Sequence, residues 1–302
     1  MQESKALHYV LGLSLALIAL FVVVALVMIN TRASDTTVTI NNVSPVVLES
    51  AVDAGAAITL NSGALKNVVA TATVQDLNGN ADIDTVTMTL YRSGAVNGVT
   101  CSIDDNDCYR IAACALTNNA DPTQKIATCT FSFEHYADST SASGRYPLEN
   151  WKLYVKVTDL DLTIGELNTT TTEVNDLLSL SFPATINFGV VGLSTQGYTN
   201  STITNVGNQR SGVNISTADP DGMNCTVRGV IPINKQEFAD ATFVMATAGT
   251  VLTATPTDTL LTIDWQATGT DTSDILYFGV DVPPSGVEGV CTQVDTLTAF
   301  AK

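Results

Sequence analysis

The sequence predicts an all-β protein that carries one N-terminal α-helix and two tandem β-sandwiches. Three observations support this fold class. The residues from Tyr9 to Ile29 form an uncharged apolar run. After this run, short segments rich in Thr and Val alternate polar with apolar residues, which is typical of strands that place one face in a core. All six cysteines follow the run, and an even number beyond such a segment favours disulfides in an oxidising compartment.

The apolar run is long enough for one helix to cross a hydrocarbon layer of about 30 Å. Its core exceeds the roughly 7–15 residues of a secretory signal, so retention is favoured over cleavage after Ala33. Lys5 before the run and Arg32 after it balance each other, but the short head and large tail favour a cytoplasmic N-terminus. We therefore expect an extracellular, cell-surface protein whose helix lies in the membrane before or instead of assembly.

A short polar leader ends at Lys5-Ala6, and the apolar helix and a β domain follow. Over about the first 35 residues this layout resembles archaeal-type pilins and archaellins. The resemblance implies that a peptidase removes the leader, so that the mature chain begins at Leu7, and that the helices bundle in a filament core with the β domains outside. The junction lacks the Gly, and the helix lacks the early Glu, of bacterial pilins. A single-pass membrane anchor is an equal alternative.

The first sandwich is predicted over residues 36–175, after the helix and linker of residues 1–35. Its alternating segments are residues 36–40, 68–74, 85–91, 127–133 and 151–157. Loops rich in Asp, Asn, Gly and Ser separate them, as in a β-sandwich. Residues 166–178 are expected to hold at most a short turn.

Three pieces of this region carry a family resemblance: Ala70-Thr-Ala-Thr-Val-Gln-Asp76, Val86-Thr-Met-Thr-Leu90 and Leu153-Tyr-Val-Lys-Val-Thr-Asp159. They resemble immunoglobulin-like surface domains of the cadherin and PKD kind. The resemblance covers about residues 36–175. It implies a fold more than a function, because the motifs are common.

The second sandwich is predicted over residues 176–302. Ala184-Thr-Ile-Asn-Phe188-Gly189-Val-Val-Gly192 and Thr202-Ile-Thr-Asn205-Val-Gly207-Asn208 resemble a second immunoglobulin-like class, which pairs an "FG" strand end with a later "TNxGN" turn. Surface proteins, filament-associated proteins and the abnormal-spindle type of domain contain this class. Gly and Asn at these positions suit turns with positive φ. Residues 243–248, 260–265, 275–282 and 290–300 are expected to complete the second of two tandem immunoglobulin-like β-sandwiches.

The cysteines are Cys101, Cys108, Cys114, Cys129, Cys225 and Cys291. None lies in a CxxC pair and only His135 is nearby, so the spacing gives little support for zinc. If the two domains fold separately, the two cysteines of the second must pair with each other. The four in the first domain allow three pairings, of which the most local joins the first to the second and the third to the fourth.

A net charge of −17 and a pI near 4.2 argue against a nucleic-acid partner, because no basic stripe is present to neutralise phosphates. No GxSxG, HExxH or phosphate-binding Gly loop occurs, so no catalytic residue is assigned and the chain is predicted not to be an enzyme. His135 is expected to be structural or solvated. Trp151 and Trp265 are expected in cores, and Tyr198 at the surface.

The segment Asp76-Leu-Asn78-Gly79-Asn80-Ala-Asp82-Ile-Asp84 alternates oxygen ligands around a Gly, as a hard cation requires. It lacks the downstream Glu of an EF-hand, so other strands must contribute, and Asp159 and Asp161 are expected at the same end of the sandwich. The hypothesis is one Ca²⁺ bound by Asp76, Asn78, Asn80, Asp82 and Asp159. The alternative is an Asx-rich turn that caps its own backbone. Asp104, Asp105 and Asp107 form a weaker second candidate.

Sequons for N-glycosylation occur at Asn42, Asn168, Asn200, Asn214 and Asn224. The leading functional hypothesis is a non-catalytic structural subunit of an extracellular pilin-like filament, a homopolymer built through the apolar helix. The alternative is a membrane-anchored surface or adhesion protein, whose partner is the lipid bilayer. A glycan-binding module or secreted hydrolase is a third possibility.

Overall fold

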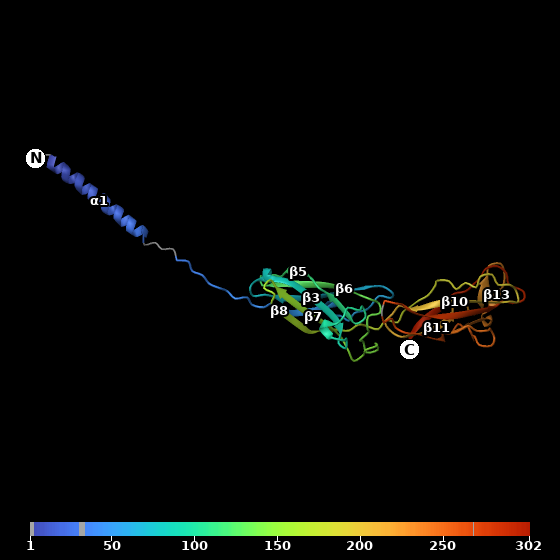
Figure 1. The fold of residues 1–302 in the computed structure, drawn as a ribbon. Helices are drawn as coiled ribbons and strands as arrows, with labels where there is room; N and C mark the ends of the chain where they lie inside the picture. Colours follow the sequence, from blue (N-terminus) through green and yellow to red (C-terminus); the bar gives the residue numbers. More distant parts are fainter. Residues whose placement is uncertain (1–2, 30–33, 268) are drawn as a thin grey trace. The chain divides into compact units, whose positions relative to one another are not determined.

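The computed structural model describes residues 3–29, 34–267 and 269–302, without the side chains of residues 3–7 and 25–29. The chain divides into two compact units, Met1–Asn42 and Val43–Lys302. The first contains the helix α1 (Glu3–Ile29), and the second contains every strand (Figure 1). The predicted domain boundaries at residues 35 and 175 stay a prediction. The cleavage position after Ala33 lies outside the described residues.

The helix α1 forms where the sequence is rich in Leu, Ala and Val and has no proline. From residue 34 to residue 45 the chain has no regular secondary structure, so the strand expected at residues 36–40 is wrong. The exposed fractions of Val38 and Ile40 are 83% and 79%. Polar–apolar alternation alone therefore does not make residues 36–40 a strand.

The first sandwich consists of two antiparallel four-stranded sheets. One sheet contains, in spatial order, β1 (Val46–Val52), β2 (Lys66–Gln75), β6 (Gln124–Phe133) and β5 (Ala115–Asn118). The other contains β4 (Cys108–Ile111), β3 (Ile83–Arg92), β7 (Trp151–Asp159) and β8 (Ile164–Thr172). Alternate residues of β7 are buried, as its period-two pattern predicts. Phe131, Phe133 and Trp151 fill the core, where the ring of Tyr109 stacks on that of Phe133.

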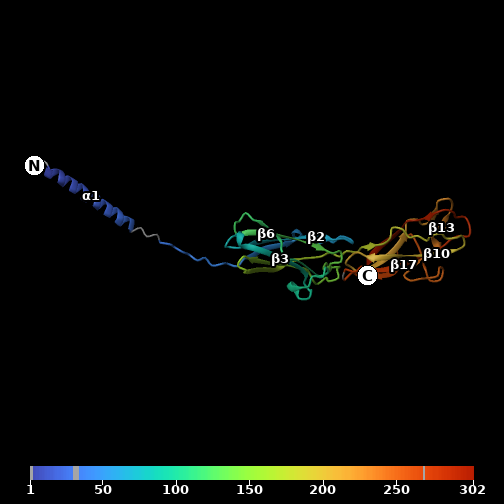
Figure 2. The same ribbon diagram turned by 45° about the horizontal axis from the view of Figure 1, so that its top comes forward.

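The second sandwich has a five-stranded and a three-stranded sheet, with a small sheet beside them. The five-stranded sheet contains β15 (Thr250–Val251), β14 (Gln236–Ala239), β17 (Thr272–Asp281), β10 (Gln196–Asn205) and β9 (Leu180–Ser181). The three-stranded sheet contains β16 (Thr257–Ile263), β11 (Ser211–Thr217) and β19 (Asp295–Ala301). The small sheet contains β13 (Val230–Pro232), β12 (Gly222–Cys225) and β18 (Cys291–Thr292), and Figure 2 shows the strands from a second direction.

The predicted fold class is confirmed: the chain is all-β with one N-terminal helix, and its strands form two tandem immunoglobulin-like β-sandwiches. Two local expectations are wrong. Residues 243–248 form a turn, in which Phe243 packs edge-on against Tyr198. Residues 166–172 belong to β8, an edge strand whose Thr-rich sequence hides the alternation.

The structure forms three disulfides. They join Cys101 to Cys108 and Cys114 to Cys129, and the third joins Cys225 to Cys291. The first two are the local pairs expected in the first domain, and the third is the pair expected if the two domains fold separately. The third bond links facing residues of β12 and β18, so it fixes the register of the small sheet.

The two sandwiches contact each other through the turn that follows β10. The side-chain nitrogen Nδ2 of Asn208 donates to the carbonyls of Ala137 and Asn175, at 2.9 and 3.1 Å. Its Oδ1 accepts from the Leu177 N–H at 2.7 Å. Gly207 does not need positive φ, contrary to the expectation. It is required because a Cβ there would lie 2.0 Å from the Leu177 carbonyl oxygen.

Candidate functional site

The first candidate site is the surface of α1, which is apolar on all sides. Twelve large apolar side chains between Tyr9 and Val24 have exposed fractions from 46% to 82%. They are Tyr9, Val10, Leu11, Leu13, Leu15, Leu17, Ile18, Leu20, Phe21, Val22, Val23 and Val24. The hydroxyl of Ser14 donates to the Val10 carbonyl at 2.7 Å and so is satisfied within the helix. A helix that is apolar all round requires cover on every side, unlike an amphipathic helix that docks one face on a domain.

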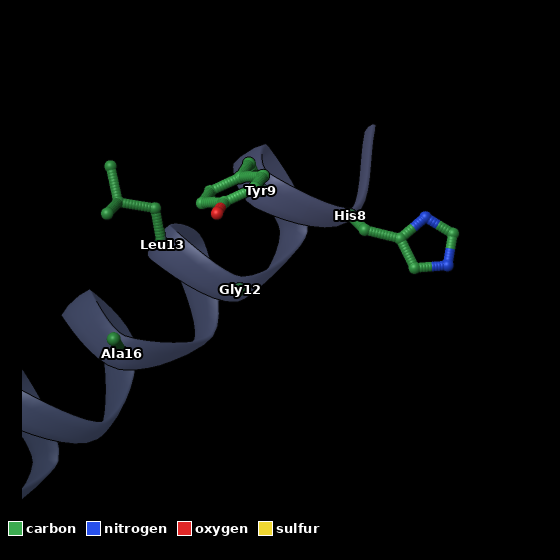
Figure 3. Close-up of a pocket in the computed structure, with 5 residues that line it drawn as sticks. All are labelled: His8, Tyr9, Gly12, Leu13 and Ala16. Carbon is green, nitrogen blue, oxygen red and sulfur yellow. The ribbon is translucent and has the colours of Figure 1, made fainter. Parts of the chain in front are cut away.

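The helix surface is indented near its N-terminal end. Figure 3 shows Tyr9 and Leu13 projecting from one side, His8 projecting from another, and little side chain at Gly12 and Ala16. A Cβ added at Gly12 would meet no atom within 4 Å. The indentation is therefore open surface of the helix.

A search of the described residues finds no helix with the length and hydropathy needed to cross a bilayer. The expected transmembrane helix from Tyr9 to Ile29 is thus not supported there.

The second candidate site is an acidic pole of the first sandwich. We use this name for Asp76, Asp82 and Asp159. Asp76 directly follows β2, Asp82 directly precedes β3, and Asp159 ends β7. Because β3 and β7 are antiparallel and Ile83 faces Asp159, the loops at this end lie together. One carboxylate oxygen from each of the three residues lies within 4.8 Å of the others. Three of the five predicted calcium ligands are therefore brought together.

Asp76 is the most enclosed member of the acidic pole, with 1% of its surface exposed. Its Oδ1 accepts from the backbone N–H of Asn78 at 2.8 Å, which is the Asx turn that the alternative hypothesis expects. Its Oδ2 is buried and has no hydrogen-bond partner. The Asx turn therefore gives a hydrogen-bond partner to Oδ1 of this carboxylate but not to Oδ2.

Asp159 is fully buried and is held by the turn that follows β7. Its Oδ1 accepts from the Thr163 N–H at 2.7 Å, and its Oδ2 accepts from the Thr163 hydroxyl. The Leu160 N–H donates to the Asp82 carbonyl at 2.9 Å and ties the two loops together. Burial, together with the carboxylates of Asp76, Asp159 and Asp161, raises the pKa of Asp82. The acidic pole therefore concentrates negative charge.

The other two predicted ligands have different partners. Asn78 Oδ1 accepts from the Val43 N–H at 2.8 Å, and the Asn80 amide nitrogen contacts the Gln124 carbonyl at 3.5 Å. Lys125 lies near the pole, but its Nζ donates to the Ile83 carbonyl at 2.8 Å. Among the described residues, Asp76 and Asp82 form no salt bridge.

The opposite end of the β3–β7 pair holds a buried ion network that sequence reasoning missed. Arg92 faces Trp151 across the pair, and 8% of its surface is exposed. Its guanidinium donates to Asp138 at 2.8 Å and to Glu149, and it lies 3.4 Å from an Asp107 oxygen. Burial alone lowers the pKa of Arg92, but Asp138 and Glu149 outweigh it and raise that pKa.

The network continues toward the second sandwich. Arg145 donates to Asp138 at 3.2 Å, and its guanidinium lies 4.0 Å from the centre of the Trp265 ring. Arg210 lies over the same ring at 5.1 Å. The expectation that Trp265 is a core residue is therefore wrong, since its ring is half-buried and contacts two cations. Trp151 is buried as expected, and its Nε1 donates to the Asp138 carbonyl at 2.9 Å.

The weaker cation candidate is a capped turn. Asp104 Oδ1 accepts from the N–H groups of Asn106 and Asp107, at 3.0 and 2.9 Å. Asp105 has a φ of 64°. Among the described residues, its carboxylate does not belong to a group of three acidic side chains close enough to share one ion. Burial and Asp104 raise the pKa of Asp107 to about 6, against the opposing effect of Arg92. The Asp104 side chain thus caps its own turn, and Asp107 pairs with Arg92 in the buried ion network, so neither residue needs a bound cation.

His135 is 8% exposed, and its ring meets Tyr136 edge-on. Tyr198 is 46% exposed, as expected for a surface aromatic. The sequon residues Asn42, Asn168, Asn200 and Asn224 are exposed, whereas Asn214 is half-buried in the central strand β11. Glycosylation of these residues stays a prediction.

Comparisons with known proteins give distant similarities only. No family model matches the chain, and no curated protein matches it. Among solved structures, the CsuC–CsuE chaperone–tip adhesion subunit complex of archaic Csu pili from Acinetobacter baumannii is similar at 12% identity and a TM-score of 0.36, over 83% of this chain and 99% of that one. The CupB6 tip adhesin from Pseudomonas aeruginosa is similar at 10% identity and a TM-score of 0.26, over 84% and 94%. At such TM-scores neither structure supports a conclusion about the partners of this chain.

Proposed function

We propose that this chain is a non-catalytic structural subunit of an extracellular pilin-like filament, in which α1 packs against α1 of other copies and the β-sandwiches lie outside. The observation that carries the proposal is the helix that is apolar on every side. Burying one large apolar side chain contributes about 1.5–3 kcal/mol, so the twelve exposed ones represent on the order of 20 kcal/mol of uncovered surface. A bundle of identical helices covers such a surface from all directions.

The rest of the chain is suited to the outside of such a filament. Its three disulfides favour an oxidising exterior, and the net charge of −17 keeps the outward-facing domains soluble. Residues 34–45, without regular secondary structure, connect the helix to β1. The proposal assigns the chain no catalytic step.

The test is electron microscopy of material sheared from producing cells, together with the mass of the mature chain. Leu17→Lys places a charge in the middle of the apolar surface, and we expect it to abolish fibres while the disulfide-bonded domains still fold. Leu148→Lys is the matched control, because Leu148 is 99% exposed on a loop of the first sandwich. We expect this variant to assemble normally.

The outcomes separate the proposal from its alternative. Sedimenting fibres and a mature chain that begins at Leu7 support the filament. A full-length monomer that is released only by detergent, from wild type and Leu148→Lys alike, contradicts the filament and supports a membrane-anchored surface protein. A freely soluble product that begins near Ser34 contradicts both.

A further inference from the structure

We propose that the acidic pole binds one hard divalent cation, with Ca²⁺ as the best fit, through carboxylate oxygens of Asp76, Asp82 and Asp159. The site is independent of the filament. Its ligands come from two loops far apart in the sequence, and neither loop is part of α1.

The spacing of the oxygens fits a single ion. Calcium lies about 2.3–2.6 Å from each of its oxygen ligands, so two oxygens on opposite sides of one ion are about 5 Å apart at most. The three carboxylate oxygens lie within 4.8 Å of one another, inside that limit. Three carboxylates carry charge enough to hold a divalent ion, and water supplies the coordination positions that protein oxygens do not.

The unpartnered oxygen of Asp76 is an independent indication of a ligand. A buried polar atom without a partner is costly, and native proteins rarely leave one. Asp76 Oδ2 is such an atom, and its carboxylate belongs to the acidic pole. The Asx turn does not use it, because the Asn78 N–H binds Oδ1. A cation at the pole gives this oxygen a partner and offsets the repulsion among the three carboxylates.

The position of the site suggests what the ion does. The loop after β2 carries Asn78, whose side chain accepts from Val43, where the sandwich begins. Asp159 ends β7, directly before the turn at the same end of the sandwich. An ion bound to both loops therefore fixes the end of the first sandwich at which its chain enters, and it stabilises the folded state by mass action.

The experiment measures thermal unfolding of the full-length chain in detergent, in EDTA and then in CaCl₂ at constant ionic strength, with MgCl₂ as a second probe. We expect calcium at about a hundred times its Kd to raise the Tm by about 5 to 10 °C. Asp82→Asn keeps an oxygen at this half-buried position but removes one of the three ligand charges, so the fold survives while cation binding weakens. We expect this variant to lose the calcium response and to melt higher than wild type in EDTA, since repulsion is relieved.

Asp84→Asn is the matched control, with the same charge change two residues away on an exposed side chain that accepts a hydrogen bond from the neighbouring Thr85 hydroxyl. We expect it to keep the full calcium response. An equal Tm of wild type in EDTA and in CaCl₂ overturns the proposal. So does an equal calcium response in Asp82→Asn and Asp84→Asn, which would show general screening of an acidic protein. Loss of fibres in Leu17→Lys bears on neither result.

Discussion

Three carboxylates lie close together at each end of the β3–β7 pair, but the groups around them differ. At one end, the Arg92 guanidinium contacts the carboxylates of Asp107, Asp138 and Glu149. At the other end, Asp76, Asp82 and Asp159 bring three carboxylates together, and neither Asp76 nor Asp82 has a salt bridge within the described residues. Each end gathers three acids on the same two strands and their loops. At the Arg92 end the guanidinium contacts all three acids, whereas the Lys125 ammonium near the acidic pole donates to the Ile83 carbonyl.

This difference shows how acidic clusters in one domain can have different roles. A built-in guanidinium makes the first cluster permanent, and its partners extend to the ring of Trp265 in the second sandwich. Under the cation proposal, the acidic pole takes its counter-ion from the solution, and its stability is then expected to vary with conditions. The comparison predicts opposite responses to substitution at the two ends.

The largest expected effect comes from removing the built-in cation. Arg92→Met leaves the buried carboxylate of Asp138 with only Arg145, and breaking a buried ion pair costs about 3–5 kcal/mol. Urea unfolding measures this loss. Arg228→Met is the control, since its ion pair with Glu288 is exposed and is expected to contribute about 0–1 kcal/mol. Equal losses in the two variants would contradict the structural role of the network.

A smaller effect is expected when the acidic pole receives a cation of its own. Asp82→Lys places an ammonium beside Asp76 and Asp159, as Arg92 stands beside its acids. We expect the free energy of unfolding in EDTA to rise, because an attractive charge replaces a repulsive one. We also expect calcium to leave the Tm of this variant unchanged. A variant that is less stable than wild type in EDTA would show that repulsion at the pole is unimportant.

A third expected effect concerns pH. Burial raises the pKa of Asp107 to about 6, above its unfolded value of 3.8. Between these values the folded state binds a proton that the unfolded state does not, so the contribution is complete below pH 4 and is lost as the pH rises through 6. We expect the stability of wild type relative to Asp107→Asn to be greater at pH 4.5 than at pH 7.5. A constant difference between the two proteins would contradict the raised pKa.

Much of the fold was predictable, because a strand with one buried face has apolar and polar residues in alternation. Residues 68–74 and 151–157 alternate except at Val69 and Tyr154, and they lie inside β2 and β7. The pattern misleads at residues 36–40, where alternation exists without a partner strand. The polar–apolar pattern is absent from β8, because this edge strand ends in a run of threonines.

The candidate site was predictable in part, for a related reason. Asp76, Asp82 and Asp159 were found because topology alone brings the loops of neighbouring strands together. Asn78 was assigned to the ion because its residue type fits, but its side chain accepts from Val43. The Arg92 network gave no local signal, since its partners lie 15, 46 and 57 residues further along the chain.

The side chain of Asn208 has a mechanical consequence. Its three hydrogen bonds reach the body of the first sandwich at Ala137 and the connecting segment at Asn175 and Leu177. A hinge between the sandwiches would have to break these bonds and displace the Leu177 carbonyl from Gly207. Tension or shear applied to the C-terminal sandwich is thus transmitted through side-chain bonds as well as through the peptide backbone.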